Sequence, residues 1–332
     1  MRPHRSVARV ASKREGNVAS VASSPDSPVK QAAETPQLRQ ALEHACRERG
    51  LSTAGAKLIH YYSNAVYLLP DEHAVARLTH GGRDAEQVRH IQRVVSWLTE
   101  QAAVSATAPR PGAEAVAVDH QTTVSFWTHY PQPDNGPEFT SAHLAHILRH
   151  LHDAEQPPFS LERWQPLTSL ATVLDDPAHA DTLLPGDLTW LRDAVADVKR
   201  RVQALDSPLG HGLIHGDAWA GNLLWNTAAG PDQAVLGDWD WVSLGPREVD
   251  LVPSWHAVRR YGKNQDWADT FARAYGYNLT NWTGIETLLL MRDLMQITGP
   301  LRRARDSSTF AEVLRERLDG IRSGAGGSWR GL

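Results

Sequence analysis

The chain has 332 residues, of which 41% are hydrophobic and 22% are charged, and its formal net charge is −4. These values are ordinary for a globular protein of one two-lobed domain or two domains, and no apolar run approaches the ~18 residues of a membrane span. The negative charge argues against nucleic acid as a partner, and the single cysteine, Cys46, excludes an intramolecular disulfide and a cysteine-based zinc site, so we expect a cytoplasmic protein without an obligate protein partner.

Residues 1–35 are rich in Ser, Ala, Val and basic side chains, and we interpret them as a disordered extension. They lack the continuous apolar core of a secretory signal; an organelle transit peptide is the less favoured alternative. Thr35 followed by Pro36 predicts a helix start, because threonine caps helices and proline suits the first helical position.

The first part of the chain predicts a small antiparallel sheet that carries a helix. After a helix that ends at Gly50, strand-like runs alternate with Gly, Pro and Asn-containing connections, and one amphipathic helix interrupts them. The expected strands are 57–62, 66–69, 74–79, 115–118 and 122–127, and the expected helices are 37–49 and 83–101. We therefore predict an N-terminal lobe over residues 36–128.

From Ser141 onward the pattern is mainly helical, and a connector of five residues from Trp127 precedes it. The expected helices are 141–153, 161–175, 187–205, 247–261, 267–275, 282–298 and 310–322. We predict a larger, mainly helical C-terminal lobe over residues 129–332, so that the fold class is α+β with two lobes.

Between the third and fourth of these helices, acidic and amide side chains follow short apolar runs. Leu213-Ile214 precedes His215-Gly216-Asp217, Asn222 lies five residues after Asp217, and residues 234–237 precede Asp238. Apolar runs this short, bounded by Gly, Asn or Pro, are typical of buried strands. We expect one carboxylate at the end of one strand, an amide on the following loop, and a second carboxylate at the end of a neighbouring strand.

This set of side chains suits phosphoryl transfer from a nucleotide. A carboxylate, Asp217, orients the attacking hydroxyl and takes its proton, while the amide oxygen of Asn222 and the carboxylate of Asp238 hold Mg²⁺. Taken alone, Asp217 is better explained as a loop residue that caps a turn; the three residues together favour the functional interpretation. His211 and His215 also allow a zinc hydrolase, but Gly210 and an apolar run argue against the helix that such a pair needs.

The motif resembles the fingerprint of the aminoglycoside phosphotransferase family, whose members share the protein-kinase fold. The resemblance rests on His-Gly-Asp with Asn222, on Asp238 and on Asp250-Leu251, and it extends to Ser63-Asn64-Ala65-Val66 and Val75-Ala76-Arg77-Leu78. It covers roughly residues 38–330. It implies that Asp217 is catalytic and that Asn222 and Asp238 bind Mg²⁺; Asp240 ranks lower as a ligand, and Asp250 braces the catalytic loop.

The same resemblance implies a nucleotide site made by the sheet and the connector. Arg77 reaches the phosphates, Val75 packs on the adenine, and Ser63 and Asn64 replace a glycine-rich loop. In the connector, the cofactor-binding residues are Trp127, Thr128 and His129. An exposed strand arginine and an ordinary hairpin turn at Ser63 and Asn64 remain the alternatives.

One departure concerns the glutamate that pairs with the basic residue of the third strand in relatives. Its expected position lies near His90 and Ile91, and the nearest acid, Glu86, comes one to two turns early. The sequence therefore leaves the acidic partner of Arg77 open.

We expect an ATP- and Mg²⁺-dependent kinase, with GTP as an alternative donor, that phosphorylates a small-molecule hydroxyl. The resemblance favours an aminoglycoside-like antibiotic as the acceptor. The alternatives are a kinase of choline, homoserine or macrolide type, and a catalytically weak nucleotide-binding regulatory protein, which the missing glutamate and the absent glycine-rich loop motivate.

Overall fold

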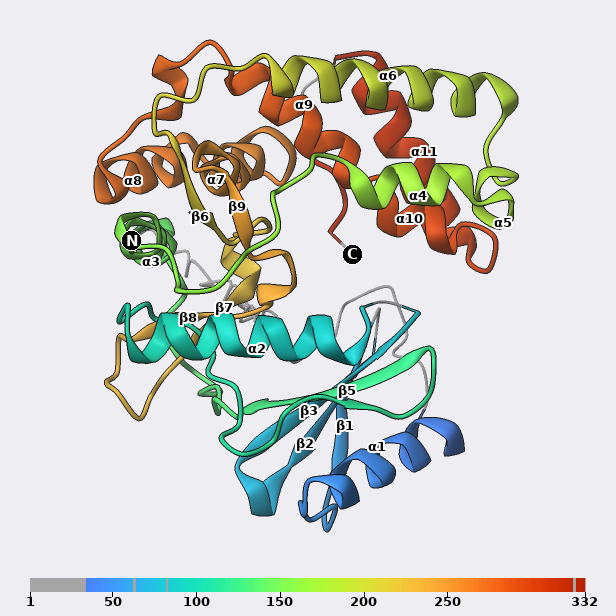
Figure 1. Ribbon diagram of the computed structural model, residues 1–332. Coiled ribbons are helices and arrows are strands. Elements are labelled where there is room, and N and C mark those ends of the chain that lie inside the picture. The colour runs from blue at the N-terminus through green and yellow to red at the C-terminus, as the bar shows by residue number, and fades with distance from the viewer. Residues whose placement is uncertain (1–33, 62–63, 82, 325–326, 332) are drawn as a thin grey trace, which may run out of the picture.

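A computed structural model describes residues 34–61, 64–81, 83–324 and 327–331 of the chain. Within them, a five-stranded antiparallel sheet with two helices forms one lobe, and a larger set of helices forms the other (Figure 1). The predicted α+β, two-lobed fold is thus confirmed. Of the expected N-terminal extension, only its last two residues belong to the described part of the chain.

The sheet of the smaller lobe has the strand order β1-β2-β3-β5-β4. Its strands are β1 (Lys57–Tyr61), β2 (Asn64–Leu69), β3 (Ala74–His80), β4 (Val116–Ala117) and β5 (Thr122–Thr128). Along β2 and β3, buried residues alternate with half-buried ones, so each strand turns one face to the lobe's core.

Helix α1 (Pro36–Glu48) covers one face of this sheet. It begins as the sequence predicts, with Pro36 at its first position and the Thr35 hydroxyl accepting from Leu38 N at 3.3 Å. Its apolar side seals a small core in which Leu42 and Cys46 are fully buried. Burial, reinforced by the negative charge of Glu72, raises the pKa of the Cys46 thiol to about 11.

Helix α2 (Ala85–Glu100) lies between the sheet and the helical lobe (Figure 1). Asp84 and Gln87 form a reciprocal capping box at its start. Its apolar residues, among them Val94 and Leu98, join the core of the helical lobe rather than that of the sheet. Buried Gln92 fixes the helix to the sheet, because its amide group donates to Phe126 O and accepts from Ala115 N.

The helical lobe surrounds one large apolar core. Its helices are α3 (Ser141–Asp153), α4 (Thr168–Asp175), α5 (Pro177–Ala180), α6 (Pro185–Gln203), α7 (Glu248–Arg260), α8 (Gln265–Tyr275), α9 (Ile285–Met295), α10 (Thr298–Arg303) and α11 (Ser308–Arg322). Among the described residues, no helix combines the length and the apolar character needed to span a membrane.

The largest differences from the predicted helix boundaries occur at two places in the helical lobe. The helix expected from residue 161 begins only at Thr168, because Pro166 disfavours a helical residue before it and Leu167 has a left-handed φ of 59°. The single helix expected over 282–298 is shorter, and α10 follows it as a separate helix.

Two small antiparallel sheets carry the acidic motif. Strand β6 (His211–Ile214) pairs with β9 (Ser243–Pro246), and β7 (Leu223–Trp225) pairs with β8 (Ala234–Leu236). The two apolar runs that we expected to be neighbouring strands, β6 and β8, therefore belong to different sheets. Strands β7 and β9 were missed, because three- or four-residue strands with mixed composition carry no usable period.

Candidate active site

The loop between β6 and β7 carries Asp217 and Asn222. The Asn222 side-chain nitrogen donates to the backbone oxygen of Asp217 at 3.0 Å, and Asn222 itself is buried. The backbone oxygen of Asn222 accepts from Gly237 N at 2.8 Å, directly before Asp238. The structure thus brings together the three oxygen-bearing residues of the predicted site, although 21 residues separate the first from the last.

Asp250, in the first turn of α7, supports the start of this loop. Its carboxylate is fully buried and accepts from the backbone N–H groups of His215 and Gly216 at 2.6 and 2.8 Å. His152 of α3 also contacts it at 3.1 Å. The expected bracing contact of Asp250 is present, and it gives two buried backbone donors a carboxyl partner.

His215 fills the space beneath the loop. It is buried, its Nδ1 accepts from Asp217 N at 3.3 Å, and its Nε2 therefore donates to Gly237 O at 2.9 Å. Its ring lies 4.6 Å from that of Trp239. His215 is thus used as a brace between the two acidic loops, and His211 is exposed on β6, which leaves the zinc alternative without support.

Asp238 has an unusual backbone for a residue with a side chain. Its φ is 61°, in the left-handed region that Asp and Asn adopt more readily than most residues. Partial desolvation of its carboxylate raises its pKa, although 45% of the side chain stays exposed; Arg77 opposes that rise, and Asp240 and Asp217 add to it. A cation beside Asp238 would lower that pKa again.

The donor set fits a divalent cation shared with a nucleotide. The Asn222 side-chain oxygen accepts no hydrogen bond from the described residues, since only its nitrogen is engaged, and Asp238 uses one carboxylate oxygen toward Arg77. In the described part of the chain, no three His, Cys, Asp or Glu side chains come together as a metal site. An amide and a carboxylate supplemented by phosphate oxygens is the kind of set that Mg²⁺ takes.

Arg77 lies on β3, on the face that Val75 shares. Both are half-buried, whereas the intervening residues point into the lobe's core. The guanidinium donates to both carboxylate oxygens of Asp240, at 2.9 and 2.7 Å, and lies 3.1 Å from Asp238. With the Asn64 amide oxygen turned toward it, Asn64 accepts from Arg77 at 3.1 and 2.6 Å. Ser63, the other residue predicted here, lies outside the described residues.

The acidic partner of Arg77, which the sequence left open, is therefore Asp240. Glu86 pairs instead with Arg89 and Arg93 of its own helix, at 3.1 and 3.3 Å. Sequence reasoning ranked Asp240 below Asp238 as a metal ligand and did not link it to Arg77, since nothing in its local spacing indicates an arginine 163 residues away.

The three connector residues predicted to bind the nucleotide lie at the end of β5 and just beyond it. Trp127 stands opposite Val75 in the β3–β5 register, so their side chains share a face. Thr128 N donates to Ala108 O, and His129 N donates to His73 O. Burial, helped by the charge of His73, lowers the pKa of His129.

Gln132, which sequence reasoning missed, fastens the connector to the helical lobe. Its side chain donates to Trp225 O at 3.2 Å and accepts from Trp225 N at 2.9 Å. No motif marks this glutamine, because its partner is a backbone that only the folded chain brings near.

Arg292 of α9 is the second residue that the sequence did not indicate. Its Nη1 donates to Asp217 Oδ1 at 2.5 Å. The arginine is buried, and its Nε has no hydrogen-bond partner among the described residues. A cationic group therefore lies directly against the predicted catalytic carboxylate.

Four tryptophans crowd the motif, and they divide into two kinds. Trp225 and Trp239 are core residues, whereas Trp219 and Trp241 are 47% and 42% exposed. The guanidinium of Arg83 lies 4.5 Å from the Trp241 ring centroid. Exposed aromatic rings beside the acidic loops offer flat apolar surface to a ligand.

Asp134, Glu138 and Glu248 are acids that could attract an amine of a substrate, but none of them contacts Asp217 among the described residues. Glu248 is fully buried and accepts from Leu209 N at 2.7 Å, so it is neither solvated nor available to a substrate. Asp134 and Glu138 are exposed on the segment after the connector.

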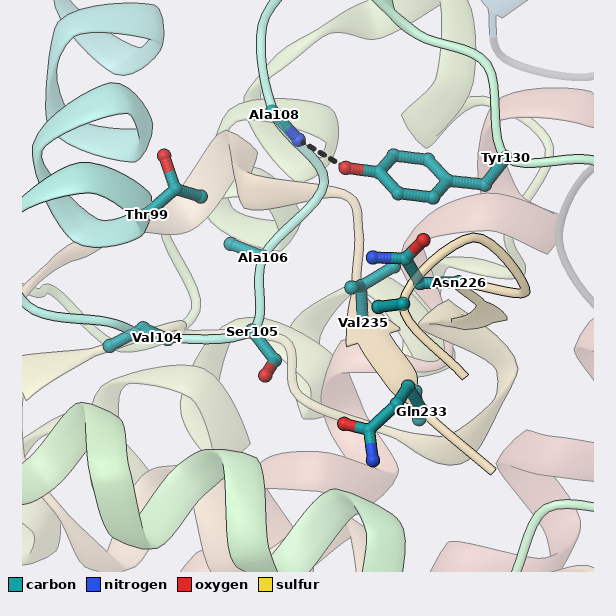
Figure 2. Close-up of a pocket in the computed structure, with 11 residues that line it drawn as sticks. Thr99, Val104, Ser105, Ala106, Ala108, Tyr130, Asn226, Gln233 and Val235 are labelled. Carbon is teal, nitrogen blue, oxygen red and sulfur yellow. Dashed lines mark hydrogen bonds between the residues drawn. The ribbon is translucent and has the colours of Figure 1, made fainter. Parts of the chain in front are cut away.

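A separate cavity of about 250 Å³ lies where the end of α2 meets the β7–β8 hairpin (Figure 2). Thr99, Ala106, Tyr130, Asn226 and Val235 are among its lining residues, and the Tyr130 hydroxyl accepts from Ala108 N at 3.1 Å. None of the predicted site residues lines it, so we do not assign it to the chemistry of the acidic loops.

Comparison with known proteins identifies related sequences and folds. The model of the phosphotransferase enzyme family matches residues 56–288, which is most of the chain and includes both acidic loops. No curated protein sequence matches the chain significantly.

Several solved structures with the same fold carry the names of small-molecule kinases. A microcompartment-associated aminopropanol kinase superposes with a TM-score of 0.66 at 17% identity, over 85% of this chain and 95% of its own. An amicoumacin kinase in complex with AMP-PNP and Ca²⁺ gives 0.62 at 14%, over 87% and 94%. A choline kinase from Streptococcus pneumoniae gives 0.56 at 12%, over 86% and 98%. At these identities the likeness establishes the fold.

Proposed function

Because the chain belongs to the phosphotransferase enzyme family, we propose that it transfers the γ-phosphate of ATP, in the presence of Mg²⁺, to a hydroxyl group of a small molecule. The observation that carries this proposal is that Asn222 links the two acidic loops. Its side chain bonds to Asp217 O, and its backbone oxygen bonds to Gly237 N, next to Asp238, which contacts Arg77 of β3. The names of the kinases with the same fold identify small molecules as their acceptors, which supports a small-molecule acceptor here.

Asp217 is the proposed catalytic residue. One of its oxygens is held by Arg292, and the other accepts no hydrogen bond from the described residues, so it can receive the acceptor's hydroxyl group. As the hydroxyl oxygen forms its bond to the γ-phosphorus, the bond to the ADP oxygen breaks, and Asp217 takes the hydroxyl proton late in the transfer.

The nucleotide would lie against β3 and the connector. Arg77 meets its phosphates with Asn64 beside them, while Val75 and Trp127 give the base an apolar surface. Thr128 and His129 of the connector lie at the edge of that surface. Asn222 and Asp238 would hold the Mg²⁺, which screens the phosphate charge when bound. GTP is the alternative donor.

For the acceptor, an aminoglycoside-like antibiotic remains the first class to test, as the family resemblance suggests. Two observations favour the alternative of macrolide type. Arg292 places a positive charge on Asp217, and an acceptor with several amines near its reactive hydroxyl meets like-charge repulsion there. The exposed rings of Trp219 and Trp241 suit a bulky, partly apolar acceptor.

The test is ADP release from Mg-ATP with kanamycin, spectinomycin, erythromycin, choline and homoserine as acceptors, together with a resistance screen of cells that express the chain. Replacing Asp217 by Asn should lower kcat by about 10²- to 10⁴-fold with any acceptor that is phosphorylated. Turnover that survives Asp217→Asn would refute the proposed mechanism. Tight Mg-ATP binding without turnover of any acceptor would favour the regulatory alternative.

A further inference from the structure

We propose that Asp240 is the positioning residue for Arg77 and that it takes the place of the glutamate expected on α2. This assignment rests on the proposed function, because it concerns how the chain holds nucleotide phosphates. It makes the Asp240–Arg77 pair, which joins the sheet lobe to the loop after β8, the element that prepares the phosphate site.

Two hydrogen bonds to Asp240 fix the guanidinium of Arg77. Both terminal nitrogens of Arg77 donate to Asp240, one to each carboxylate oxygen, at 2.9 and 2.7 Å. Such two-point contacts fix the plane of the guanidinium as well as its position. The Arg77 side chain is only 17% exposed, so the surrounding protein leaves it few other rotamers.

The position of Asp240 is itself well determined. It lies in a short 3₁₀ turn, η3 (Trp239–Trp241), directly after Asp238. Trp239 anchors that turn, because its buried ring donates through Nε1 to Leu236 O at 2.7 Å. Asp240 therefore presents its carboxylate from a rigid support.

Helix α2 does not supply a competing acid. Glu86 is largely exposed and is occupied by Arg89 and Arg93. At the position where the glutamate was expected, the His90 ring lies 5.8 Å from that of Phe159, and Ile91 belongs to the apolar core. Among the described residues, the carboxylates in contact with Arg77 are those of Asp238 and Asp240.

The two aspartates divide their tasks. Asp238 makes one contact with Arg77, at 3.1 Å, and part of its side chain remains open to solvent, whereas Asp240 makes two contacts. If Asp238 turned to a cation, the two bonds that Arg77 donates to Asp240 would still hold the guanidinium. The Nη1 hydrogen that Asp238 releases could then meet a phosphate oxygen.

Calorimetry with two ligands tests the assignment. Mg–AMP-PNP carries the phosphates that Arg77 would meet, and adenosine lacks them. We expect Asp240→Asn to weaken Mg–AMP-PNP binding by about tenfold or more, as loss of a two-point charge-assisted contact implies, and to leave adenosine binding unchanged. Asp240→Glu, which keeps the charge, should recover part of the loss.

The matched control is Glu86→Gln, which removes the α2 carboxylate and should leave both affinities unchanged. If Asp240 only repelled the phosphates, its replacement by Asn would strengthen Mg–AMP-PNP binding. The assignment is therefore overturned if Asp240→Asn binds Mg–AMP-PNP as tightly as the unaltered chain or more tightly. It is also overturned if adenosine loses the same factor, which would indicate a structural role, or if Glu86→Gln is equally damaging. If the unaltered chain bound neither ligand, the proposed function would fail first and this assignment with it.

Discussion

Arg292 donates to the carboxylate of Asp217 at 2.5 Å, from a helix 75 residues further along the chain. The contact holds one oxygen of Asp217 and leaves the other without a partner among the described residues. The cationic partner of Asp217 therefore comes from α9 in the helical lobe and not from the sheet lobe, where the nucleotide is proposed to bind.

The first prediction concerns this pair. Arg292→Gln should lower kcat by about ten- to a hundredfold, equivalent to roughly 1.5–3 kcal/mol for a hydrogen bond to a charged group, and leave the KM for Mg-ATP unchanged. Arg292→Lys should retain more activity, because it keeps the charge. Steady-state ADP release with a phosphorylated acceptor measures both parameters. Full turnover by Arg292→Gln would show that the pair has no part in catalysis.

The second prediction concerns the cation. Asn222→Ala should raise the Mg²⁺ concentration for half-maximal activity by at least about tenfold, since it removes a proposed ligand together with the hydrogen bond to Asp217 O. Asn226→Ala is the matched control, because Asn226 lies at the β7–β8 hairpin, outside the acidic loops. Equal Mg²⁺ requirements for the two variants would contradict the proposed role of Asn222.

The third prediction concerns Gly216, whose φ of 84° and close neighbours both disfavour a side chain. A Cβ atom there would lie 2.6 Å from Trp241 O. Gly216→Ala should lower the free energy of unfolding by about 3 kcal/mol or more, from left-handed strain and overpacking together. Gly50 also has a positive φ, but a Cβ atom on it would have no neighbour within 4 Å, so Gly50→Ala should cost only about 1–2 kcal/mol. Urea unfolding compares them, and equal losses would refute the steric argument.

The fourth prediction concerns pH and the buried cluster around Asp293. Burial opposes ionisation of Asp293, but hydrogen bonds from Arg260 and His256 outweigh it and lower its pKa. A lowered pKa means that Asp293 contributes stability above its unfolded pKa of about 3.9 and loses that contribution as the pH falls through the lower, folded value.

Asp293→Asn should therefore cost about 3–5 kcal/mol at pH 7, as expected for breaking a buried pair, and less below about pH 4. Urea unfolding of both proteins at pH 7, 5 and 3.5 measures the difference. A difference that stays constant over this range would show that the ionisation of Asp293 is not the source of the stability.

Much of the smaller lobe could be predicted from the sequence, because its strands alternate in polarity and its helices carry local caps. β3 shows the first advantage: its buried alanines alternate with Val75 and Arg77, so the shared face follows from the period. The start of α4 was placed too early, since apolar spacing alone does not reveal that Pro166 and Leu167 delay the helix until Thr168.

The candidate site divides in the same way. Asp217, Asn222 and Asp238 follow apolar runs at short range, and the chain itself indicates them. The partners of Arg77 and Asp217 come from elements 163 and 75 residues away, and Gln132 binds a backbone 93 residues away. No local pattern encodes such contacts, because only the folded chain brings these elements together.

Cys46 has a practical consequence. It is the only thiol in the chain, it is sealed between α1 and the sheet, and its raised pKa keeps it protonated at neutral pH. A maleimide dye would react with the native chain only when α1 lifts away, so the labelling rate reports the opening of that single interface without any engineered cysteine.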